Sequence, residues 1–159
     1  MDEIEVRVHI RAAIEQVFDF IANVETHPQY ADFCKRVEFT SDRRTGAGAT
    51  FRQVVHRMGH THEVRSTIVG WDRPRRIVWV NDTPRGPRSM EISYDLADAP
   101  EGVEVVHRVK DLAMRTGEAK REEIEENERE LANLKRILEG QAGGRAAGGQ
   151  GKEPDTGTR

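Results

Sequence analysis

Residues 89–96 read SMEISYDL, and this stretch alternates between apolar and polar side chains. The even-numbered positions carry Met, Ile, Tyr and Leu, whereas the odd-numbered positions carry Ser, Glu, Ser and Asp. A period of two is typical of a β-strand with one buried face, because successive side chains point to opposite sides. The stretch therefore predicts a strand in a sheet that is covered on one side.

The same kind of sequence extends outward over residues 37–110. β-branched and aromatic runs are interrupted by turn sequences: TGAG at 45–48, MG at 58–59, DRP at 72–74, PRGP at 84–87 and DAPEG at 98–102. Turns at this spacing predict about six strands joined as an antiparallel meander.

A strand and two short helices are expected before the meander. Residues 4–10, IEVRVHI, alternate as a half-buried strand, and residues 11–24 carry an apolar face at helical spacing. Pro28 predicts a break, and Tyr30 and Phe33 predict a second short helix after it.

A long helix is expected after the meander, over residues 116–139, with Gly140 as its end. Its apolar residues form a narrow stripe: Ile124, Leu131, Leu134 and Leu138. A sheet with one apolar face needs a cover, and this helix can supply it. The expected fold class is α+β, with a curved sheet that grips a helix.

Length, composition and net charge limit the number of domains and the kinds of partner that the chain can have. Its 159 residues include 36% hydrophobic and 33% charged residues, and the net charge is −3. One domain over residues 1–140 is expected, followed by a Gly-rich tail over 141–159 that we expect to be disordered. The near-neutral net charge gives no reason to expect a nucleic-acid partner. No apolar run is long enough for stable membrane insertion. The acidic N-terminus does not resemble a signal peptide.

Cys34 is the single cysteine, so no intramolecular disulfide is expected. This usage fits a reducing compartment, and we expect a cytoplasmic protein in which Cys34 is a small buried filler.

Pairing across the turns predicts which side chains share the inner face. A two-residue turn at 58–59 sets Val55 beside His62 and Phe51 beside Ser66. The next hairpins set Ile68 beside Trp79, Trp79 beside Ile92, and Ile77 beside Tyr94. The last hairpin is expected to set Ile92 beside His107 and Tyr94 beside Val105.

Several polar side chains fall on this inner face: Gln53, His62, Ser66, Asn81, Tyr94 and His107. Unpaired polar groups in a dry core would each cost about 1–3 kcal/mol, whereas a cavity holding water or a ligand would tolerate them. Hydrogen-bonded core residues are the alternative. The outer face receives Val54, Val69, Val78, Val80 and Val106, which indicates either an apolar surface, as in a homodimer, or a register slip of one residue.

These features together resemble a known family. The stretch VFDFIANVETHPQYADFCKRVEF (17–39), the glycines of GAGATF (46–51), GWDRPRRIVW (70–79) and NLKRILEG (133–140) are similar to the polyketide cyclase/dehydrase and lipid-transport proteins of the START-like, or SRPBCC, superfamily. The resemblance implies a helix-grip fold: a seven-stranded antiparallel sheet around a long C-terminal helix, with a cavity between them. Such proteins bind lipids, sterols, isoprenoid quinones or polyketides, and some cyclise or dehydrate polyketides.

Three functions stay open. The first is a carrier or chaperone of a hydrophobic small molecule. The second is a cyclase/dehydrase-type enzyme in which His107 and Tyr94 transfer protons. The third is a protein-interaction module that uses the outer valines or the tail. The residues predicted to contact a ligand are Tyr30, Phe33, Phe51, Val55, Val64, Ser66, Ile68, Trp79, Asn81, Met90, Ile92, Tyr94, His107, Ile124, Asn127 and Leu131.

No cofactor and no metal are expected. His60 and His62 share a strand face, but His56 points away from them and no carboxylate or cysteine completes a ligand set. The arginines of the two loops around 73–76 and 85–88 are interpreted as solvated.

Overall fold

The computed structural model describes residues 2–57, 59–112 and 116–147. Seven strands form one antiparallel sheet in this part of the chain, in the order β1-β7-β6-β5-β4-β3-β2. Their bounds are β1 Asp2–Ile10, β2 Cys34–Phe39, β3 Thr50–Arg57, β4 His60–Asp72, β5 Arg76–Thr83, β6 Gly86–Ala99 and β7 Gly102–Asp111. The six-stranded meander is confirmed, and β1 extends it by pairing with β7.

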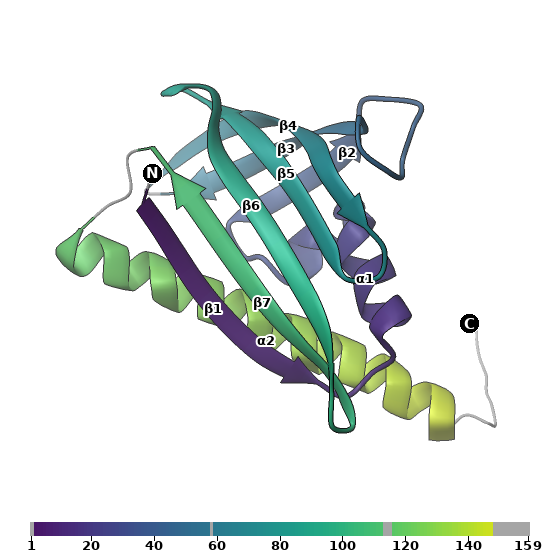
Figure 1. Cartoon of the computed structure of the whole chain (residues 1–159). Coiled ribbons are helices and arrows are strands. Elements are labelled where there is room, and N and C mark those ends of the chain that lie inside the picture. Colours follow the sequence, from purple (N-terminus) through teal and green to yellow (C-terminus); the bar gives the residue numbers. More distant parts are fainter. Residues whose placement is uncertain (1, 58, 113–115, 148–159) are drawn as a thin grey trace, which may run out of the picture.

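Two short helices, α1 (Ile14–Ala22) and the 3₁₀ helix η1 (Val24–Gln29), follow β1, and the long helix α2 (Gly117–Ala147) follows β7. The sheet curves around α2, which runs across it and along β1 (Figure 1). The chain therefore has the α+β, helix-grip arrangement expected from its sequence.

The second short helix lies earlier than predicted. Pro28 lies inside η1, and Tyr30 and Phe33 follow the helix instead of forming it. Pro28 has no N–H to donate, and η1 ends one residue after it at Gln29, so a helix ends near the proline, and residues 30–33, all of them described, form no further helix.

Strand pairing confirms the expected register at three hairpins. Val55 pairs with His62, Ile68 with Trp79, and Trp79 with Ile92. The last hairpin differs from the prediction, because Ile92 pairs with Val109 and Tyr94 with His107. Ala99 pairs with Gly102, so the turn is centred one residue later in the chain than predicted, and the register moves by two residues. A shift of two leaves every side chain on its predicted face.

Helix α2 does not end at Gly140 but continues to Ala147. Gly140 does not adopt the positive φ of a terminating glycine, and an isolated glycine costs a helix only about 1 kcal/mol relative to alanine. The predicted tail, 141–159, lies outside the described residues from 148 onward, so the domain boundary at 140 stays a prediction.

The apolar core occupies one end of the space between sheet and helix. Leu131, Leu134 and Leu138, from the middle of α2 onward, are at most 1% exposed and belong to one buried cluster with Phe18 and Ile21. The preceding part of α2 directs polar residues toward the sheet instead, so the apolar core does not extend to this end of the space.

The outer face of the sheet is more charged than the valines suggested. Val78 and Val80 are 7% and 8% exposed, so neighbouring side chains cover them. Arg108 lies within ion-pair distance of Glu5 and Asp95 on this face. Among the described residues, the large apolar side chains that remain exposed are Val69 and Leu112. No helix in the described ranges has the length and apolar composition needed to span a membrane.

Candidate functional site: a cavity between the sheet and helix α2

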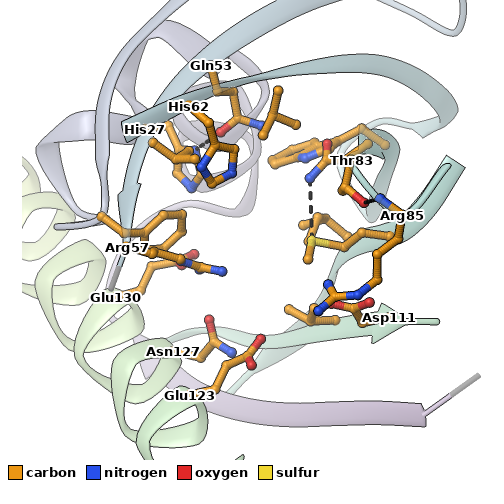
Figure 2. A pocket seen from close by; sticks show the side chains of 18 of the residues that line it. His27, Gln53, Arg57, His62, Thr83, Arg85, Asp111, Glu123, Asn127 and Glu130 are labelled. Atoms are coloured by element: carbon orange, nitrogen blue, oxygen red, sulfur yellow. Dashed lines mark hydrogen bonds between the residues drawn. The ribbon is translucent and has the colours of Figure 1, made fainter. Parts of the chain in front are cut away.

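A cavity of about 460 Å³ lies between the inner face of the sheet and the first half of α2. Strands β3 to β7 supply one wall, and α2 supplies the other through Glu123, Asn127 and Glu130. These three residues are spaced i, i+4 and i+7, so they lie on one face of the helix. Figure 2 shows the labelled side chains arranged around a common open space. This volume falls within the usual range of small-molecule sites.

A chain of hydrogen bonds crosses the floor of the cavity from η1 to β5. The His27 Nδ1–H donates to Gln53 Oε1 at 3.1 Å, Gln53 Nε2 donates to Ser66 Oγ at 3.2 Å, and the Ser66 hydroxyl donates to Asn81 Oδ1 at 2.7 Å. Asn81 Nδ2 then donates to the Met90 sulfur at 3.5 Å. Gln53, Ser66 and Asn81 of the inner face are thus paired with one another across neighbouring strands.

A second polar cluster joins the sheet to α2. The Tyr94 hydroxyl donates to Glu130 Oε2 at 2.5 Å, and His107 Nε2 lies 3.6 Å from the same oxygen. The Tyr94 and His107 rings are stacked with their centroids 4.3 Å apart. His107 Nδ1 donates to the Ser93 carbonyl at 3.2 Å, which leaves Nε2 directed toward Glu130. All three side chains are at most 2% exposed.

Burial changes the acidity of several groups around this space. Desolvation raises the pKa of the Tyr94 hydroxyl well above 10, and the acidic Glu130 beside it raises it further. Burial lowers the pKa of His27, which keeps this imidazole neutral near neutral pH. Burial also raises the pKa of the Cys34 thiol to about 12, so Cys34 is the inert buried filler that the sequence predicted.

Several charged side chains lie around the cavity, including two arginines. Arg57 forms an ion pair with Glu126 at 2.9 Å, and its guanidinium lies 3.9 Å from the centre of the Phe33 ring. Arg85, which the sequence placed in a solvated loop, also lines the cavity. In Figure 2, Arg85 and Asp111 lie across the space from Arg57.

Ten of the predicted contact residues line this cavity: Phe33, Val55, Val64, Trp79, Asn81, Met90, Ile92, Tyr94, His107 and Asn127. Six others lie outside its lining: Tyr30, Phe51, Ser66, Ile68, Ile124 and Leu131. Of these six, all but Ser66 pack in or against the apolar core, and Ser66 lies within the hydrogen-bonded floor. These six residues are directed into the interior as predicted. They do not line the cavity, because α2 or the short helices pack closely against the sheet at their positions.

Sequence reasoning missed several lining residues, above all His27, Arg57, Glu123 and Glu130. The two glutamates carried a signal, because they share the helical spacing of Asn127. His27 carried none, since nothing in the sequence indicates that η1 turns its side chain inward.

The described residues contain no group of three His, Cys, Asp or Glu side chains positioned to hold a metal ion. His60 and His62 line the cavity on one strand face, and His56 lies outside this lining, as the alternation predicted.

Comparisons with known proteins agree with this architecture. A family model described as polyketide cyclase/dehydrase and lipid transport matches residues 1–139. The structure of TTHA0849 from Thermus thermophilus has a TM-score of 0.68 at 19% identity, over 86% of this chain and 97% of that one. DR_A0006 from Deinococcus radiodurans has a TM-score of 0.66 at 18% identity, over 87% and 98%.

A third structure is the di-domain ARO/CYC StfQ from the steffimycin biosynthetic pathway. It has a TM-score of 0.67 at 16% identity, over 89% of this chain and 52% of that one, so the likeness spans about half of StfQ. No curated protein matches the sequence. At these identities the structural likeness shows the fold.

Proposed function

The chain belongs to the polyketide cyclase/dehydrase and lipid-transport family, and on this premise we propose that its cavity binds a hydrophobic small molecule as a carrier or chaperone. The observation that carries the proposal is the cavity of about 460 Å³ at the centre of the fold, where a globular domain would otherwise pack its core. Apolar side chains make up much of its wall, among them Val55, Val64 and Ile92.

The arrangement of the polar groups favours a carrier. A proton-transfer residue must come within hydrogen-bond reach of the reacting group. The Tyr94 hydroxyl instead donates to Glu130, and His107 is held between Ser93 and Glu130. Both candidate catalysts are therefore engaged by partners within the protein.

Native mass spectrometry of freshly purified protein tests this function. A carrier retains a non-covalent apolar molecule, so the native mass exceeds the sequence mass, and the same sample under denaturing conditions gives the sequence mass alone. The released molecule can then be extracted and identified. A bare native mass, together with no retention after incubation with long-chain fatty alcohols, would count against the proposal.

A second candidate function, a cyclase/dehydrase-type enzyme, rests on the same Tyr94–His107–Glu130 cluster. A buried carboxyl group beside a tyrosine and a histidine could exchange protons with a ketone. Deuterium uptake at the α-carbons of a ketone such as tetralone, incubated in heavy water, separates the two functions. An enzyme accelerates uptake and loses this ability in Glu130→Gln, whereas a carrier binds the ketone without accelerating uptake above the buffer rate.

A further inference from the structure

Three buried N–H groups of residues that line the cavity have no hydrogen-bond partner among the described residues: Arg57 Nε, Trp79 Nε1 and Asn127 Nδ2. The Arg57 guanidinium already pairs with Glu126 through Nη2, whereas Trp79 and Asn127 offer neutral donors. Trp79 is 1% exposed on β5, and Asn127 is 3% exposed on α2, so the two donors come from opposite walls. Buried polar groups in folded proteins are nearly always paired. Three exceptions on residues that line one cavity indicate that an occupant of this cavity supplies their acceptor.

The chemistry of these donors restricts the occupant. An indole N–H can donate a hydrogen bond but cannot accept one, so its partner must be an acceptor. This requirement holds whichever way the Asn127 amide is turned. The other polar groups of the floor already pair with one another, from His27 through Gln53 to Asn81.

The charges around the cavity restrict it further. The buried acidic side chains of its wall are Asp111, Glu123 and Glu130, each at most 8% exposed. Two arginines also line the cavity: Arg57, whose charge is paired with Glu126, and Arg85, which is exposed. A ligand carboxylate placed deep enough to reach Trp79 would lose its hydration and approach the buried carboxyl group of Glu130, beside Tyr94, in a medium that screens charge poorly.

We propose that the ligand is an uncharged apolar molecule with a carbonyl oxygen, which accepts hydrogen bonds from Trp79 and Asn127. This inference rests on the proposed function and adds the polar recognition group to it. The carbonyl orients the ligand between β5 and α2, while the apolar wall holds its hydrocarbon part. A molecule of the same shape without the oxygen leaves both donors unpaired and binds less tightly.

Three probes of one ring skeleton test the inference: fluorenone, fluorene, which lacks the oxygen, and fluorenone carboxylate, which adds a negative charge. The chain has two tryptophans, so a proton–nitrogen correlation spectrum shows two indole N–H signals. Trp71→Phe assigns them, and Trp71, which stacks edge-on against Phe18, is the internal reference. Fluorenone is expected to move the Trp79 indole proton downfield, with the Trp71 signal unchanged. Fluorene is expected to bind about ten-fold more weakly, without that downfield shift.

A matched pair of variants completes the test. Asn127→Asp replaces a donor by an acceptor and should weaken fluorenone binding about ten-fold while leaving fluorene binding unchanged. Asn23→Asp makes the same change at an exposed position outside the cavity and should alter neither. Equal affinities for fluorenone and fluorene, or tightest binding of the carboxylate, would overturn the inference and leave the proposed function intact. Failure of all three probes to bind would contradict the proposed function itself.

Discussion

His27 shows how one buried residue couples the cavity floor to pH. Its ring is 5% exposed and lies 5.2 Å from the Tyr30 ring and 6.0 Å from the Trp79 ring, centre to centre. The Nδ1–H is used by Gln53, and desolvation disfavours a second proton, so the pKa lies below its ordinary value of 6.5. The folded state therefore binds fewer protons than the unfolded state once the pH falls to this value.

This difference predicts a loss of stability in acid. The contribution of His27 is fully present above about pH 6.5 and is lost as the pH falls below it, by at most about 1.4 kcal/mol per pH unit. His27→Asn keeps a donor near Gln53 but removes the titration. Urea unfolding at about pH 7.5 and about pH 5.5 should therefore show a smaller decrease in the free energy of unfolding for His27→Asn than for the unmodified protein.

The control for this measurement is His56→Asn, which changes an exposed histidine. It should keep the pH dependence of the unmodified protein. If His27→Asn and the unmodified protein lost the same stability on acidification, the neutral buried state of His27 would be wrong.

The side chains that face inward were predictable residue by residue, because alternation fixes the face of a strand. Trp79, Tyr94 and His107 were all placed correctly in this way, even across the hairpin whose register was wrong by two residues. Their hydrogen-bond partners were not predictable. Glu130 is one of many glutamates in a charged helix. Only the position of α2 against the sheet shows that it is the one that accepts a hydrogen bond from Tyr94.

At the level of elements, alternation identifies a face but not the distance of each position from the covering helix. Phe51 and Val55 share a face of β3, yet Phe51 packs in the core and Val55 lines the cavity. The difference arises from α2, which packs its leucines at one end of the sheet and presents Glu123, Asn127 and Glu130 at the other. The path of the helix depends on long-range packing, which short sequence patterns do not contain.

The continuation of α2 past Gly140 makes a testable difference. Gly140 has ordinary helical backbone, and a Cβ added there would meet no atom within 4 Å. Gly140→Ala should therefore raise the free energy of unfolding by about 0.4–1 kcal/mol, because alanine has less conformational freedom to lose on folding. Thermal or urea unfolding measures the change.

Gly102→Ala provides the contrast. Gly102 has a φ of +155°, and a Cβ there would lie 2.1 Å from the Ile10 carbonyl oxygen, so this variant should be destabilised. A loss of stability in Gly140→Ala would instead indicate a glycine with positive φ, and hence a helix that ends at 140 as the sequence suggested.

For the whole molecule, the order of elements and the one-sided meander were enough to predict a sheet that grips a helix. A cavity was predicted from six polar residues on the inner face, and three of them, Gln53, Ser66 and Asn81, form the hydrogen-bonded floor. The valines on the outer face do not form a broad exposed apolar surface, because neighbouring residues of the chain bury Val78 and Val80. The cavity between the sheet and α2, and not the outer surface, is therefore the feature on which the proposed function rests.

The central claim is that this cavity takes up an apolar ligand, and a titration with the uncharged fluorescent probe N-phenyl-1-naphthylamine tests it most directly. Val64 and Val69 lie on the same strand, but Val64 lines the cavity and Val69 is 38% exposed on the outer face. We predict that the unmodified protein and Val69→Phe bind one probe molecule with enhanced fluorescence, and that Val64→Phe, folded but with its ring in the cavity, does not. Equal binding by both variants, or no binding by the unmodified protein, would contradict the account.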